Sequence, residues 1–175
     1  MDNKFNKLRV IPAVLLMLVI YIVMHESGHA MVILLAGSKI TEFSIIHARV
    51  SFEGGSYTPF MTMWREVNGA LFPLLISFVY MIFYRKDIRN GFYRIFSFVF
   101  CVSEIMSTIV WVIIPFLYMN GYDDKGEDVV KFLDVFVRYH DARFISICAL
   151  MIMIIGGLLI YKKRIIHSAI EFFRC

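Results

Sequence analysis

The sequence predicts an all-α polytopic membrane protein with about four transmembrane helices and a small β-hairpin between the first two helices. Two observations predict this class. Of the 175 residues, 59% are hydrophobic and only 18% are charged, which is too apolar a composition for a soluble domain of this size. The apolar residues also form runs long enough to cross a bilayer, which takes about 20 helical residues. We therefore expect residues 1–175 to form one membrane-embedded domain.

Each expected span follows from an apolar run and from the residues that interrupt it. The first run stops at Gly37-Ser38. The third is the longest and contains Pro115, which predicts that its helix bends or ends there, because proline cannot donate the helical backbone hydrogen bond. The predicted spans cover about residues 10–36, 67–84, 92–119 and 142–161.

A short alternating segment separates the first two spans. Apolar and polar residues alternate through much of 40–52, and Gly54-Gly55 follow. Alternation with a period of two, bounded by glycines, is typical of a β-hairpin. Because an isolated hairpin is marginally stable, we expect this one to pack on the helices or to dip into the membrane interface.

The charged residues predict how the bundle is oriented. The net charge is +4, but the basic residues collect at span ends and form no stripe that would bind nucleic acid. They precede the first span, separate the second from the third and follow the fourth, whereas the loop after the third span is acidic. By the positive-inside rule, both termini are cytoplasmic and the hairpin and the acidic loop face outward. We expect a multi-pass protein of the cell membrane.

The first span carries the motif His25-Glu26-Ser27-Gly28-His29. In H-E-x-x-H on a helix, two imidazoles four residues apart share one face and can bind one Zn²⁺, while the glutamate can accept a proton from a metal-bound water. Ionisable side chains inside hydrocarbon are costly unless they pair or bind a metal. We therefore interpret His25 and His29 as metal ligands and Glu26 as the catalytic base.

A catalytic zinc site needs a third protein ligand. We favour Asp128, which opens an apparently amphipathic segment in the acidic loop and could alternatively cap that helix. Asp123 and Asp124 in the same loop remain alternatives. Glu104, the only carboxylate within the third span, is a further alternative as a ligand or as a partner of a ligand.

These residues resemble the site-2 protease family of intramembrane zinc metalloproteases. The resemblance rests on the HESGH motif in a membrane span, on the hairpin after it, on Asn68-Gly69 and the following residues at the start of the second span, and on Pro115 preceding an aspartate. It covers roughly residues 10–135 and implies Asp128 as the third zinc ligand. The chain differs from the family pattern in having Val129 after Asp128, and it is also similar to short, divergent relatives described as zincin peptidases.

The resemblance implies a zinc-dependent endopeptidase that cleaves peptide bonds in or near transmembrane segments. The substrate would be a membrane protein or a signal-peptide remnant within the lipid bilayer, and a regulatory membrane partner or a homo-oligomer is compatible with this activity. The family usually opens its site toward the cytosol, whereas the charges here place the motif toward the outside. The alternative function is a non-catalytic zinc-binding membrane protein with a partner, immunity or chaperone-like role.

Overall fold

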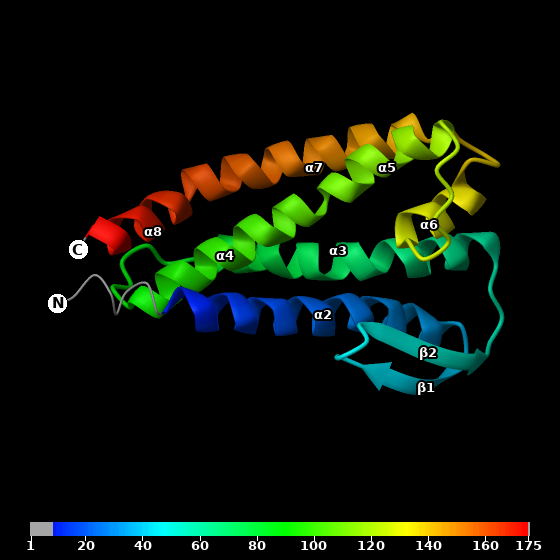
Figure 1. The fold of residues 1–175 in the computed structure, drawn as a ribbon, viewed down its shortest axis with the longest axis horizontal. Helices are drawn as coiled ribbons and strands as arrows, with labels where there is room; N and C mark the ends of the chain where they lie inside the picture. The colour runs from blue at the N-terminus through cyan, green and yellow to red at the C-terminus, as the bar shows by residue number, and fades with distance from the viewer. Residues whose placement is uncertain (1–8, 175) are drawn as a thin grey trace.

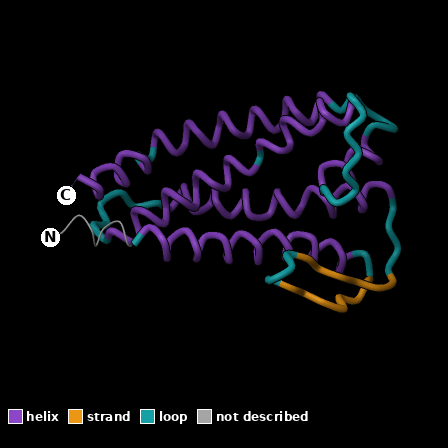
Figure 2. The backbone as a smooth tube through the Cα atoms, viewed as in Figure 1, coloured by secondary structure: helices purple, strands orange, loops and turns teal. Residues whose placement is uncertain are grey.

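The computed structural model describes residues 9–174, which form a mainly helical bundle with one two-stranded sheet (Figures 1 and 2). Lys4 and Lys7, which contribute to the predicted orientation, lie outside the described residues. The elements are α2 (Val10–Leu35), β1 (Ser38–Ser44), β2 (Arg49–Gly54), α3 (Pro59–Phe83), α4 (Gly91–Ser107), α5 (Ile109–Met119), α6 (Asp128–Phe136), α7 (Arg143–Lys162) and α8 (Ile165–Arg174). The expected fold class is confirmed.

Four helical segments are long and apolar enough to cross a membrane: Val10–Leu35, Pro59–Phe83, Gly91–Met119 and Arg143–Lys162. The protein is therefore a multi-pass membrane protein. Most of their outward side chains are apolar and exposed, as expected for lipid-facing surfaces. Helix α3 begins at Pro59, well before the span predicted from Val67, because Thr58 caps it: the Thr58 hydroxyl oxygen accepts a hydrogen bond from the Met61 amide at 3.2 Å.

The third span does not end at Pro115, the position at which the sequence predicts that its helix bends or ends. The helix continues through Pro115 to Met119, and the interruption lies instead at Thr108, between α4 and α5. The hydroxyl groups of Ser107 and Thr108 donate to the carbonyl oxygens three residues earlier, at 2.8 and 2.6 Å. Such side chains compete with the backbone amides for these carbonyls and bend helices, so this hydroxyl pair, and not the proline, marks the break.

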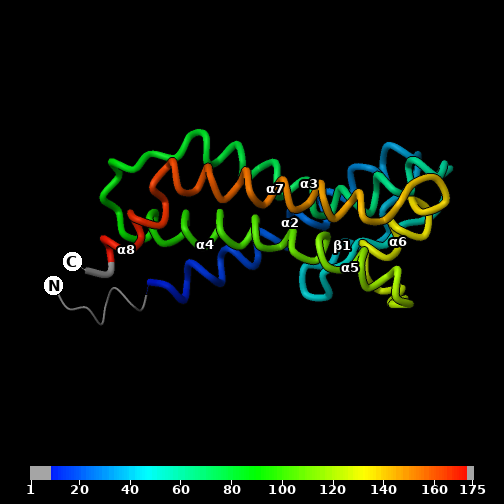
Figure 3. Tube along the Cα trace, turned by 90° about the horizontal axis from the view of Figure 1, so that it is seen from above, coloured from blue at the N-terminus to red at the C-terminus, as the bar shows by residue number. Residues whose placement is uncertain are grey.

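The core lies between α2, α3 and α4, with α7 packed on α5 and α8 packed on α4. The two strands pair antiparallel from Ser38 opposite Gly54 to Ser44 opposite Arg49. In Figure 1 their turn, residues 45–48, points back along α2 toward the middle of the bundle. The view from above (Figure 3) places α6 and the hairpin at one end of the long axis and both termini at the other.

Candidate metal centre

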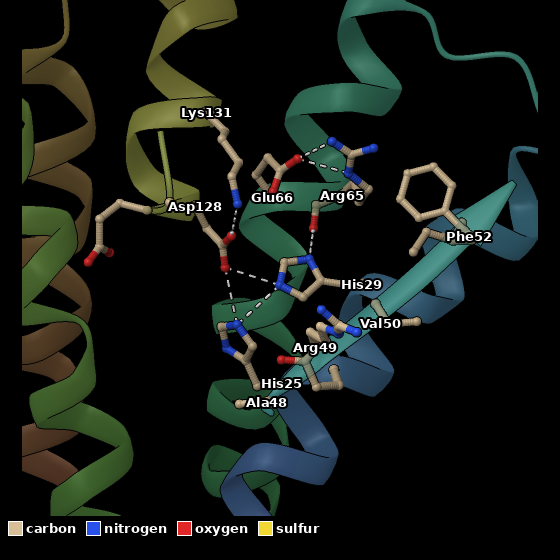
Figure 4. A pocket seen from close by; sticks show the side chains of 14 residues that line it. His25, His29, Ala48, Arg49, Val50, Phe52, Arg65, Glu66, Asp128 and Lys131 are labelled. Atoms are coloured by element: carbon tan, nitrogen blue, oxygen red, sulfur yellow. Dashed lines mark hydrogen bonds and ion pairs between the residues drawn. The ribbon is translucent and has the colours of Figure 1, made fainter. Parts of the chain in front are cut away.

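The two histidines of the HESGH motif lie one above the other on α2. Residues four apart share a helix face, and the Nε2 atoms of His25 and His29 are 3.1 Å apart. Both lie well inside the membrane-spanning helix: His25 is ten residues before its end at Leu35, about 15 Å at 1.5 Å per residue. Figure 4 shows both rings directed at the same point, next to the start of α6.

Asp128 completes the cluster from more than a hundred residues along the chain. Its Oδ2 atom lies 3.1 Å from Nε2 of His25 and 3.1 Å from Nε2 of His29 (Figure 4). Asp128 is the first residue of α6, whereas the N-cap position belongs to Glu127 and has no side-chain capping bond. The carboxylate of Asp128 therefore does not cap its helix and is turned toward the two imidazoles.

The geometry of these three atoms suits one divalent metal ion. Ligands about 2.0–2.1 Å from a tetrahedral ion lie roughly 3.3 Å from one another, close to the three separations of 3.1 Å. The Nδ1–H of His29 donates to the carbonyl oxygen of Arg65 at 2.9 Å, so Nε2 is the ring nitrogen that can bind a metal once it carries no proton. Within residues 9–174, His25, His29 and Asp128 form the one cluster of His, Cys, Asp or Glu that could hold an ion.

Lys131 lies one turn after Asp128 and binds the other oxygen of its carboxylate. The distance from Lys131 Nζ to Asp128 Oδ1 is 3.1 Å. Burial favours the neutral acid, but the hydrogen bonds to His25 and His29 and the charge of Lys131 outweigh it, so the pKa of Asp128 lies well below its usual range. Asp128 is thus held as a carboxylate with one oxygen directed at the histidines.

Two glycines let α3 approach the metal centre. A Cβ atom on Gly69 would lie 2.3 Å from Nε2 of His29, and one on Gly28 would lie 2.2 Å from the carbonyl oxygen of Asn68. The side-chain amide of Asn68 in turn donates to the carbonyl oxygen of Gly28 at 2.6 Å. These close contacts hold α3 against the HESGH motif and restrict the positions of the two imidazoles.

The metal centre opens into a cavity of about 500 Å³ between α2, β2, α3 and α6. Glu26 lines this cavity and is only 4% exposed. Opposite the histidines, Arg65 Nε donates to Glu66 Oε1 at 2.8 Å, and the Arg65 guanidinium lies 5.2 Å from the ring centres of Phe52 and Tyr57. These contacts hold the hairpin against α3, so that β2 forms one wall of the cavity.

The other carboxylates considered as third ligands lie elsewhere. Asp123 pairs with Lys125, and Asp124 accepts a hydrogen bond from the amide of Gly126. Glu104 is fully buried in α4, and neither of its carboxylate oxygens has a hydrogen-bond partner among the described residues. Of the four acids weighed from the sequence, only Asp128 joins the histidines.

Comparison of the chain with models of known protein families, with curated proteins and with solved structures finds no match.

Sequence reasoning missed the residues that support the ligands. Lys131 lies three residues after Asp128, a spacing that places both side chains on one helix face. The sequence could therefore have predicted the contact between Lys131 and Asp128. The hydrogen bond from His29 to the Arg65 carbonyl could not be predicted, because every residue has a backbone carbonyl and the residue type does not show which one accepts.

Proposed function

We propose that this chain is a zinc-dependent intramembrane endopeptidase of the site-2 protease type. One observation carries the proposal: the Nε2 atoms of two histidines in a membrane-spanning helix and a carboxylate oxygen from α6 lie 3.1 Å from one another, with the buried Glu26 lining the same cavity. A purely structural metal site has no need of a buried carboxylate beside its ligands. Peptide hydrolysis requires a base in that place.

In this proposal different residues of the chain bind the metal, orient its ligands and transfer the proton. His25, His29 and Asp128 hold the ion, Lys131 and the Arg65 carbonyl orient the ligands, and Glu26 moves the proton. When bound, zinc lowers the pKa of its water and polarises the scissile carbonyl. The carboxylate of Glu26 accepts the proton of the attacking water and delivers it to the leaving amine nitrogen.

The hairpin supplies a means of presenting substrate. A peptide bond in a helix is shielded by its hydrogen bonds, so a membrane-spanning substrate must unwind locally before it is cut. Strand β2 forms a wall of the cavity through Arg49, Val50 and Phe52 and, of the two strands, only β1 pairs with it. An extended segment could therefore add to the free edge of β2 by strand addition. We propose transmembrane segments and signal-peptide remnants as the substrate class.

The test separates metal binding from chemistry. Glu26→Gln should retain zinc, measured by elemental analysis of the purified protein, and lose cleavage of a transmembrane-segment substrate by at least about 100-fold, the lower range for general base catalysis. His25→Ala should lose both zinc and cleavage. Glu127→Gln is the matched control, because Glu127 lines the same cavity but is exposed and makes no side-chain cap.

Retention of cleavage in Glu26→Gln would reject the mechanism. Zinc in the wild-type protein with no cleavage of any membrane-segment substrate would instead favour the non-catalytic zinc-binding function. Efficient cleavage of a soluble, casein-like chain alone would reject the intramembrane substrate class.

A further inference from the structure

A second hollow lies away from the metal centre, between the α3–α4 connection and the α7–α8 junction. Figures 1 and 3 place both segments at the end of the bundle where α2 begins and α8 lies. The α3–α4 connection and the α7–α8 junction face each other there across a volume of about 420 Å³. Its lining residues are Tyr84, Arg85, Lys86, Asp87, Lys162, Lys163 and Arg164. Five of these seven are cations, so the hollow carries a strong excess of positive charge.

These cations are not neutralised by the protein. None of the ion pairs formed by residues 9–174 includes any of the five. Lys163 is held in place instead by donating to the carbonyl oxygen of Ile82, at 2.6 Å, where α3 ends. Asp87 is the one carboxylate among the lining residues, so five positive charges face one negative charge, an excess that favours an anion from outside the chain.

Arg164 occupies a backbone conformation that favours glycine. Its φ angle is 58°, in the left-handed region that ordinary side chains avoid. This residue ends the turn between α7 and α8, where glycine is the usual choice. An arginine in a strained position points to a role for its side chain.

An apolar hollow adjoins the cationic one. It has a volume of about 470 Å³ and shares Lys162 and Arg164 with its neighbour. Its other lining residues are Ile160, Tyr161, Ile166, His167 and Ile170. Helix α8 buries Ile165 and Ala169 against the bundle yet leaves Ile166 and Ile170 more than 40% exposed. Apolar side chains thus remain uncovered beside the cations, at the level where the spans end.

We propose that these two hollows bind one anionic phospholipid, with its phosphate among the cations and the start of an acyl chain against Ile166 and Ile170. A free phosphate would occupy only the cationic hollow, whereas a phospholipid would also cover the apolar side chains of the adjoining hollow. Lys162 and Arg164 lie at the boundary of the two hollows, where the phosphate ester of a lipid joins its apolar part. Basic residues next to a span attract anionic headgroups.

The proposal is tested on the full chain in detergent, with phosphatidylglycerol, phosphatidylcholine or inorganic phosphate added. Phosphatidylglycerol should raise the midpoint of thermal unfolding in a saturable manner, and the other two should not. Arg164→Gly should weaken the apparent affinity for phosphatidylglycerol about fivefold, and Lys162→Gln combined with it about 25-fold, since each such cation contributes similarly. Because glycine relieves the strained backbone, Arg164→Gly should not lower the midpoint measured in phosphatidylcholine.

Arg89→Gln is the matched control, because Arg89 is an exposed cation in the same α3–α4 connection but lines neither hollow. An equal loss in Arg89→Gln and Arg164→Gly would show that surface charge alone attracts the lipid, and would overturn the site. An equal midpoint shift with inorganic phosphate would assign the cationic hollow to a free anion and overturn the lipid assignment. If Ile166→Ser binds phosphatidylglycerol with unchanged affinity, the proposed contact between the acyl chain and Ile166 is rejected.

Discussion

At the scale of single residues, we expect metal binding to depend on Lys131, which is not itself one of the three candidate ligands. Lys131 binds Oδ1 of Asp128 and leaves Oδ2 to the histidines. Partners of this kind commonly change metal affinity by about 10–100-fold when they are removed. We therefore expect Lys131→Met to weaken zinc binding at least tenfold in a chelator competition. Lys125→Met is the control, because Lys125 pairs with Asp123 and Asp134 and not with the triad. Equal affinity in both variants would contradict the role of Lys131.

The protonation state of Asp128 determines how metal binding depends on pH. Its pKa lies well below the usual range, because hydrogen bonds from the histidines outweigh its burial, so it stays charged as the pH falls. Asp128 should therefore take up no proton in competition with the metal in mild acid. Because histidine binds a metal as the neutral imidazole, affinity should fall with decreasing pH, and the logarithm of the affinity plotted against pH should have a slope of no more than two. A slope of three between pH 4 and 6, measured by competition titration, would show that Asp128 also takes up a proton.

At the scale of elements, we expect the contact between α2 and α3 to affect both the thermal stability of the protein and its affinity for zinc. Gly69→Ala places a Cβ against the imidazole of His29, whereas Gly28→Ala places one against the backbone of α3. The first variant should lose zinc affinity with a small change in thermal stability, because side-chain rings can shift. The second should lower the unfolding midpoint as well, since a backbone carbonyl cannot move without its helix.

Gly157→Ala provides the control for both, because nothing lies within 4 Å of a Cβ at Gly157 in α7. That variant should bind zinc as the wild type does and should be no less stable, given the higher helix propensity of alanine. If Gly69→Ala and Gly157→Ala bind zinc equally well, then close approach of α3 is not needed to position His29.

The hairpin is the second element whose placement can be tested. Its turn points toward the middle of the bundle, and Ile46 at that turn is 92% exposed. If the turn dips into the bilayer, Ile46→Lys should destabilise the protein in lipid by roughly 2–3 kcal/mol, the cost of a charge in hydrocarbon. Ser56→Lys, at an exposed position just after β2 whose backbone amide alone is hydrogen-bonded, should be neutral. Comparing their unfolding midpoints in nanodiscs and in detergent distinguishes a buried turn from a solvated one.

The elements also differ in how far the sequence could predict them. The spans could be predicted from the apolar runs, and the hairpin from the alternation before Gly54. Both elements depend on patterns among residues that are close together in the sequence. The break at Thr108 was missed because Pro115 is the stronger local signal, while the competing hydroxyls of Ser107 and Thr108 act only through the geometry of one turn. The pairing of His25 with Asp128 joins residues 103 positions apart, so the sequence favoured Asp128 but left Asp123, Asp124 and Glu104 open as alternatives.

At the scale of the whole molecule, the hairpin and α6, which border the metal centre, lie toward one end of the bundle, and the α3–α4 connection and the α7–α8 junction, which line the basic hollow, lie at the other (Figure 1). In a cysteine-free background, Glu53→Cys and Lys125→Cys should therefore react with a membrane-impermeant thiol reagent from one side, and Lys86→Cys from the other. The positive-inside rule places the first two outside. The opposite labelling pattern would turn the metal centre toward the cytosol, and labelling of all three from one side would contradict four spans.

The distance along the chain between the ligands has a consequence for biogenesis. A nascent chain that has inserted only α2 carries both histidines but no carboxylate for the third position, and Asp128 arrives after α3, α4 and α5 have been made. The ribosome thus delivers the last ligand only when three of the four spans exist. If the chain is the peptidase proposed above, a partly synthesised chain should hold metal weakly and lack activity, so the order of translation should delay cleavage until the bundle is nearly complete.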